Sequence, residues 1–261
     1  MLSIGGKVGK QTTTRKSMRQ EVEPQFSELI AIIDDIQQEI KWQTKKKLIC
    51  LIDGTDKASI ETAEKLFYKH GKYLTDPTCS VVYSFPTALQ HNTHFNQVRH
   101  YFSESYLLPN FRTQMPQQQA APDPETEKQC HDLKEVICKR MAADLLEPEA
   151  LDALVHFSGG IVRSSIMLTQ RATLKALIEG KEKIKKHHVD IAINEERRIF
   201  DRLLSEKQKG LLEHVRRSND IDADPEAGYL ELLHNLSIIE YANGHVWYGV
   251  NPVVHALLRE D

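Results

Sequence analysis

The 261-residue chain is poor in cysteine, has no excess of charge of either sign and contains no long hydrophobic run. Four cysteines are few for this length, and Cys50 lies within an apolar stretch, which argues against a disulfide framework and favours a reducing, cytoplasmic setting. With 34 basic and 37 acidic residues the formal net charge is −3, so no overall field attracts a polyanion or a membrane. No apolar run approaches the roughly 20 residues that span a bilayer. We therefore expect no membrane partner.

The most informative stretch covers residues 48–57, where five apolar residues lead directly into Asp53 and, three positions later, Asp56. A continuous apolar run of strand length predicts a strand buried on both faces of a parallel sheet. Ligands bind at the carboxyl ends of such strands, and Mg²⁺ prefers carboxylate ligands. We therefore predict Asp53 as a Mg²⁺ ligand. The alternative is a buried strand followed by an ordinary Asp-Gly turn.

Helix and strand signals alternate in the first part of the chain. Apolar residues recur every three or four positions over residues 21–41, which predicts an amphipathic packing helix. A second helical stripe follows the first strand and ends near Gly71, and residues 79–84 are rich in β-formers up to Pro86. Strand, helix and strand in this order predict a βαβ unit with a parallel sheet.

The second part of the chain is predicted to be helical as far as a final hairpin. Residues 113–124 contain three consecutive glutamines and three prolines, which is typical of a linker. The apolar pattern of residues 125–205 predicts a small helical bundle. In residues 206–261 two helical stretches precede two β-rich segments joined through Asn243-Gly244, a strong hairpin signal. Helix, helix, hairpin and a terminal apolar helix are the order of a winged helix.

Together these motifs resemble the later part of an AAA+ or STAND-type P-loop NTPase, and the resemblance covers roughly residues 45–261. It implies an α/β fold in which residues 1–112 hold a partial P-loop NTPase core with a parallel sheet. An all-α lid would follow in residues 125–205, after the linker, and a C-terminal winged helix in residues 206–261. The resemblance further implies that the chain binds ATP and Mg²⁺.

The resemblance also implies which residues hold the nucleotide. Asp53 takes the position of the Walker B aspartate, and Ser84 that of the polar sensor at the tip of the next strand. Residues 158–163 are similar to the sensor-two motif, in which Arg163 would reach the γ-phosphate. A guanidinium on a mobile lid binds phosphate by charge-assisted hydrogen bonds and couples nucleotide state to lid position. We therefore expect Asp53 and Arg163 to face a common cleft.

Two further residues are candidates for the reaction itself. Asp56 matches the second acid of the Asp-Gly-x-Asp form found in STAND proteins, where it would assist catalysis; the alternative is that it caps the following helix. Gly54 occupies the position where most AAA+ proteins have the glutamate that orients the attacking water, so fast hydrolysis is not expected. Arg99 lies about where an arginine finger is sought.

The sequence has no P-loop of the form G-x-x-x-x-G-K-[ST], whose backbone amides and lysine cradle the phosphates. The nearest stretch, residues 5–12, has Ile4 in place of the first glycine and Gln11 in place of the hydroxyl. We therefore expect weak ATP binding and weak or no hydrolysis by the chain alone. The chain is a truncated product, the partner of a separate subunit or a degenerate relative, and the sequence leaves all three open. Each exposes sheet edge and apolar surface, which predicts a protein partner or a homo-oligomer.

A second hypothesis is a non-catalytic winged-helix regulator. Residues 206–261 carry five basic side chains against ten acidic ones, and residues 224–234 contain neither lysine nor arginine. Neutralisation of phosphates supplies most non-specific affinity for DNA. We therefore expect this segment to contact protein rather than nucleic acid.

Histidines and cysteines elsewhere predict no further metal site. Cys130, His131 and Cys138 do not have the spacing of a zinc site. His187 and His188 are adjacent, but the sequence offers them no third ligand. We therefore interpret them as surface histidines.

Overall fold

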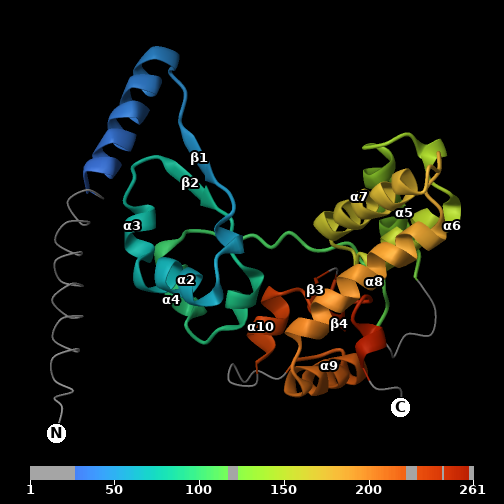
Figure 1. Cartoon of the computed structure of the whole chain (residues 1–261). Helices are drawn as coiled ribbons and strands as arrows, with labels where there is room; N and C mark the ends of the chain where they lie inside the picture. Colours follow the sequence, from blue (N-terminus) through green and yellow to red (C-terminus); the bar gives the residue numbers. More distant parts are fainter. Residues whose placement is uncertain (1–26, 117–122, 222–227, 243, 259–261) are drawn as a thin grey trace, which may run out of the picture. The chain divides into compact units, whose positions relative to one another are not determined.

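The computed structural model describes residues 27–116, 123–221, 228–242 and 244–258 (Figure 1). The fold is mixed α/β and mostly helical, with a small parallel sheet and a C-terminal antiparallel hairpin. The chain forms two compact units. The first contains the described residues up to Pro86 together with His94–Ser105, and the second contains Thr87–Thr93 and the residues from Tyr106 onward. No helix in the described part of the chain is both long and apolar enough to span a bilayer.

The first unit contains the predicted strand, helix and strand. A helix over residues 27–44 precedes β1 (Ile49–Ile52), and β2 (Ser80–Tyr83) pairs with β1 in parallel, with Ile49 opposite Ser80 and Ile52 opposite Tyr83. The predicted parallel pairing is therefore confirmed. The connecting and following helical segments are η1 (Thr55–Lys57), α2 (Ile60–Glu64), the π-helical turn η2 (Lys65–Lys69), α3 (Gly71–Thr75) and α4 (Phe95–Tyr101).

The prediction that the first strand is buried on both faces is wrong. Ile49, Leu51 and Val82 lie on one face of the sheet and are 60%, 75% and 55% exposed. Among the described residues the sheet has only two strands. Its other face is covered in part, because Ile52 on that face is 40% exposed. The ring of Tyr83 packs edge-on against Phe67 of η2, with centroids 6.2 Å apart. The apolar residues of β1 are therefore not buried on the face that contains Ile49 and Leu51.

The helix over residues 27–44 buries only part of the predicted apolar stripe. Ile30, Ile33 and Ile40 are partly buried, but Leu29 and Ile36 are more than half exposed. The contacts of this helix also include polar groups, because the backbone N–H and the hydroxyl of Thr78 both donate to the Asp34 carboxylate, at 2.9 and 2.8 Å. The predicted first turn, residues 21–26, lies outside the described part of the chain.

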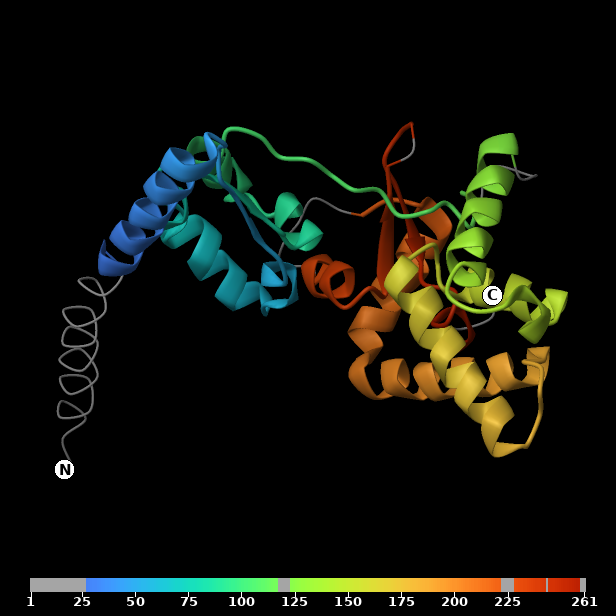
Figure 2. The same cartoon turned by 90° about the horizontal axis from the view of Figure 1, so that it is seen from above.

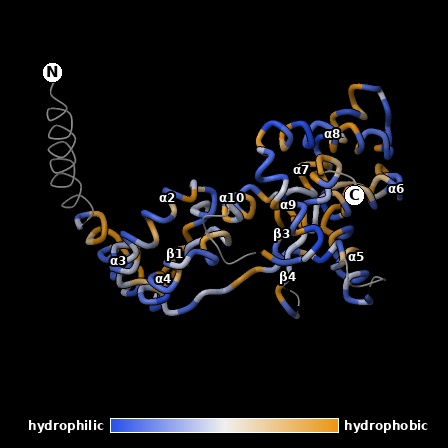
Figure 3. The backbone as a smooth tube through the Cα atoms, turned by 90° about the horizontal axis from the view of Figure 1, so that it is seen from below, coloured by the Kyte–Doolittle hydropathy of each residue, from blue (hydrophilic) through white to orange (hydrophobic). Residues whose placement is uncertain are grey.

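The second unit contains the predicted helical bundle. Its helices are α5 (Pro124–Cys138), α6 (Pro148–Phe157), α7 (Val162–Ile178) and α8 (Lys186–Leu203). Apolar and polar residues alternate along them, as Figure 3 shows. Their buried faces form a core that includes Leu133, Leu154, Leu168 and Ile193. The helical pattern predicted for residues 125–205 is therefore confirmed.

The predicted C-terminal hairpin is also confirmed. After α9 (Glu206–Ser218) and α10 (Tyr229–His234), β3 (Ile238–Tyr241) pairs with β4 (Trp247–Val250) in antiparallel register (Figure 2). Gly244, at the turn, has φ +102°, as an Asn-Gly turn requires, and Asn243 lies outside the described residues. In place of the predicted terminal helix, the described chain ends with the short 3₁₀ helix η6 (His255–Leu257).

Side chains from the bundle and from the C-terminal segment share one core. Leu212 of α9, Leu232 of α10 and Val254 are fully buried in the same cluster as Leu133 and Leu168. The start of the predicted linker joins this unit as well, because the Gln114 amide donates to the backbone carbonyl of Val250 at 3.1 Å. Of the predicted linker, residues 117–122 lie outside the described part of the chain.

Candidate functional site

The candidate Mg²⁺ ligand Asp53 directly follows β1 and is exposed. One carboxylate oxygen accepts a hydrogen bond from the Gly54 amide at 2.7 Å, and Gly54 has φ +88°, the left-handed conformation that favours glycine. The turn after β1 therefore leaves the Asp53 side chain at the carboxyl end of the strand, where parallel sheets bind ligands.

Ser84 and Asp56 meet at the same end of the sheet. The Ser84 amide donates to the carbonyl of Ile52 at 3.0 Å, which extends the pairing of the two strands by one residue. The Ser84 hydroxyl lies 2.9 Å from the Asp56 carboxylate and donates to it, and the Asp56 amide lies 3.3 Å from the same hydroxyl. The structure thus brings together three predicted residues, Asp53, Asp56 and Ser84, at the carboxyl ends of two neighbouring strands.

Thr55 is part of this arrangement, although sequence reasoning did not single it out. Its hydroxyl donates to the backbone carbonyl of Ser84 and lies 3.2 Å from the Ser84 hydroxyl. The sequence feature that could have identified Thr55 is its position between Asp53 and Asp56, in the turn that follows the strand. Thr55 holds the η1 turn against the end of β2, so it positions Asp56.

The two predicted arginines lie on separate compact units. Arg99 is exposed on α4 of the first unit, and Arg163 is exposed in the first turn of α7 in the second unit. The common cleft of Asp53 and Arg163 stays a prediction.

The turn before Arg163 is fixed by contacts within the second unit. Gly159 and Gly160 have φ +61° and +82°, and the buried hydroxyl of Tyr241 donates to the carbonyl of Gly159 at 2.7 Å. The Phe111 amide donates to the carbonyl of Gly160 at 3.1 Å. The start of α7 is therefore positioned by groups from the hairpin and from the segment before α5.

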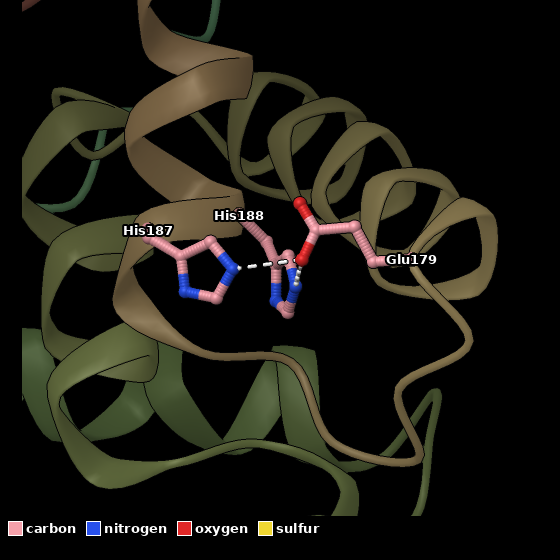
Figure 4. A group of neighbouring side chains, drawn as sticks. All are labelled: Glu179, His187 and His188. Atoms are coloured by element: carbon pink, nitrogen blue, oxygen red, sulfur yellow. Dashed lines mark hydrogen bonds and ion pairs between the residues drawn. The ribbon is translucent and has the colours of Figure 1, made fainter.

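The two adjacent histidines are not both surface residues. His188 is fully buried, and its Nε2 lies 3.1 Å from a carboxylate oxygen of Glu179, as does Nε2 of His187 (Figure 4). These hydrogen bonds lower the pKa of the Glu179 carboxyl below its ordinary value, and the one to His187 has the larger effect. Within the described residues this is the one group of three or more metal-ligating side chains whose ligand atoms lie close together.

A pair of neighbouring thiols lies in the first unit. The thiols of Cys50 in β1 and Cys79, just before β2, are 3.6 Å apart. Cys79 is buried, and burial raises the pKa of its thiol. The hydrogen bond to Cys50 raises this pKa further, with a smaller effect. Both cysteines are free, which agrees with the absence of a disulfide framework among the described residues.

Comparison with known proteins gives the chain no relative: neither a protein-family model nor a curated protein matches it. The interpretation of the site therefore depends on the residues and on the geometry alone.

Proposed function

We propose that the chain is an AAA+/STAND-like ATP-binding switch protein that needs a partner to complete its phosphate site. The observation that carries the proposal is the parallel pairing of β1 and β2, which places Asp53 and the hydrogen-bonded pair of Asp56 and Ser84 at one end of the sheet. Ligands of open α/β sheets bind at that end. A carboxylate and a hydroxyl there suit Mg²⁺ and the phosphates that it carries.

In this proposal each predicted residue has a separate role. Asp53 holds Mg²⁺, and Ser84 orients Asp56, which assists the attacking water. Arg163 contacts the γ-phosphate through its guanidinium, and Arg99 serves as the arginine finger in an oligomer. Gly54 supplies no carboxylate, so hydrolysis is slow or absent.

The exposed sheet supports the need for a partner. Ile49, Leu51 and Val82 present an apolar face, and parallel sheets are normally covered on both faces. This sequence has no P-loop, so the backbone amides that hold phosphate must come from outside it, for example from a protein partner or a second copy of the chain. ATP binding by the isolated chain is accordingly weak.

Thermal unfolding with Mg-ATP tests this proposal. A competent site at 100 times its dissociation constant adds about 2.7 kcal/mol of stability. Asp53→Asn and Arg163→Ala should abolish the shift, whereas Asp76→Asn, an exposed acid at the end of α3, should leave it unchanged. The same shift in all variants would contradict the proposal, and no shift at millimolar Mg-ATP would favour a non-catalytic binding module instead.

The alternative function, a non-catalytic winged-helix regulator, is favoured by the order α9, α10, β3 and β4. We infer that this segment would contact protein, because α10 packs against η3 (Thr87–His91) and buries Tyr229, Leu232 and Leu233. A helix held in this way presents little surface to a DNA groove, and the acidity of the segment repels phosphate. Titration with duplex DNA at low salt should show no binding. Salt-sensitive binding would support the DNA form instead.

A further inference from the structure

Glu179, His187 and His188 form a cluster of three donor groups at the end of α7 opposite to Arg163. Glu179 is the C-cap residue that follows α7, and the two histidines lie in the first turn of α8, after the connection of residues 180–185. Figure 4 shows both imidazole rings turned toward the carboxylate. Each Nε2 is 3.1 Å from the same Glu179 oxygen, and the three ligand atoms all lie within 4.8 Å of one another.

We propose that this cluster is a binding site for a divalent transition-metal ion of the zinc class. Zinc–ligand distances of about 2.0–2.2 Å place neighbouring ligand atoms roughly 3–3.5 Å apart, which matches the 3.1 Å from each histidine Nε2 to the Glu179 oxygen. Two imidazoles and one carboxylate are a known zinc donor set that leaves a fourth position open. Mg²⁺ prefers oxygen ligands and does not compete for imidazole nitrogen.

The site is held in place before any ion arrives. Ion pairs join α7 to α8, between Lys175 and Glu195 at 2.5 Å and between Arg171 and Glu196. The connection between the helices is anchored where the Ile184 amide donates to the carbonyl of Leu145 at 2.7 Å. The donors on both helices therefore approach each other without help from the metal.

Metal binding must change the protonation of His188. In the metal-free chain the Lys185 amide donates to Nδ1 of His188 at 2.9 Å, so the neutral ring carries its proton on Nε2 and donates it to Glu179. Coordination through Nε2 requires that proton to move to Nδ1. There it faces the Lys185 N–H, and two donors cannot bond to each other. His187 undergoes the same shift, and each ring keeps one proton.

The ion and the first turn of α8 consequently compete for one imidazole. The Lys185 amide closes that turn in the metal-free chain, and it must turn to water when the ion binds. Lys185 is exposed, so water can reach it. The loss of such a cap lowers the apparent metal affinity roughly fivefold. Metal binding therefore loosens the connection between α7 and α8, which makes the site a switch on that connection.

Calorimetric titration of the full chain with Zn²⁺ alone, in the presence of excess Mg²⁺, tests the site. We expect one ion per chain at this site and a loss of affinity of at least about tenfold in His187→Ala and in Glu179→Gln. His131→Ala is the matched control, because His131 and Glu135 form an exposed pair 3.6 Å apart that belongs to no three-donor cluster among the described residues. Equal affinity in wild type and His187→Ala would overturn the proposal.

A second measurement separates the switch from simple surface binding. Nitrogen NMR of the histidines should show the proton of His188 on Nε2 without metal and on Nδ1 with zinc, and the Lys185 amide should exchange faster with solvent once zinc is bound. His188→Ala is not needed, which avoids a variant that removes a fully buried side chain. Zinc bound with an unchanged Lys185 amide would refute the competition. Neither result depends on whether the chain binds ATP.

Discussion

The hydroxyl of Ser84 donates to the carboxylate of Asp56 across 2.9 Å and so joins the turn after β1 to the end of β2. The two residues are 28 positions apart in the chain, and their contact follows from the parallel register of the two strands. Asp56 therefore does not project freely from its turn. Its orientation is set by the neighbouring strand.

Removal of the Ser84 hydroxyl should loosen this end of the sheet. Ser84→Ala deletes the donor to Asp56 and the acceptor of the Asp56 amide, so we expect the free energy of unfolding to fall by about 1 kcal/mol. Urea unfolding measures the change. Ser80→Ala, at an exposed position in β2, is the control and should be nearly neutral. Equal losses in both variants would show that the Ser84 contact contributes nothing.

Local patterns were sufficient to predict the main elements. The apolar run before Asp53 and the β-rich run before Ser84 gave a correct parallel pair, because such runs favour strands wherever they pack. Asn243-Gly244 gave a correct hairpin for a similar reason, since only a few residues accept the backbone of a tight turn. These features depend on the residues themselves and on their immediate neighbours.

Features that depend on distant neighbours were not predicted. The apolar pattern of β1 shows that Leu51 favours burial, but not whether any element covers it. Similarly, the sequence around His187 and His188 did not reveal Glu179 as their third partner. A connection separates Glu179 from the two histidines, and its path cannot be read from the sequence. The packing of α7 against α8 decides both the burial of His188 and the formation of the cluster.

The exposed face of β1 should tolerate charge. Leu51 is 75% exposed, so Leu51→Lys should change the free energy of unfolding by no more than about 0.5 kcal/mol. The added charge should also reduce self-association, which light scattering measures, because apolar sheet surface promotes contact between chains. The buried counterpart is Phe67→Ala, which should cost about 3–5 kcal/mol. A large loss in Leu51→Lys would mean that the face is covered in solution.

Acid should remove the contribution of Asp123, which caps α5. The Thr126 amide donates to one oxygen of its carboxylate at 2.8 Å, and the buried guanidinium of Arg112 donates to the other oxygen. Both hydrogen bonds hold the pKa of Asp123 far below its ordinary value, and that of the amide has the larger effect. Because the pKa is lowered in the folded chain, the contribution is complete above the unfolded value of about 3.9 and is lost as the pH falls toward the folded value.

The comparison of wild type with Asp123→Asn tests this pH dependence. At pH 7 the wild type should unfold at a higher urea concentration, and the difference should shrink as the pH drops below about 4. Glu125→Gln, at an exposed position in the first turn of the same helix, is the control and should show a much smaller difference. A difference between wild type and Asp123→Asn that stays constant down to pH 2 would contradict the assignment.

Gly160 should be far less replaceable than Gly180, although both have positive φ, at +82° and +67°. A Cβ on Gly160 would lie 1.6 Å from the backbone carbonyl oxygen of Phe111, whereas a Cβ on Gly180 meets no atom within 4 Å. Gly180→Ala should therefore cost only the left-handed backbone strain of about 1–2 kcal/mol. Gly160→Ala should cost roughly 3 kcal/mol or more, because the segment at Phe111 must also move. Thermal unfolding of the two variants measures the difference, and equal melting temperatures would show that the close approach of Phe111 does not hold the turn before Arg163.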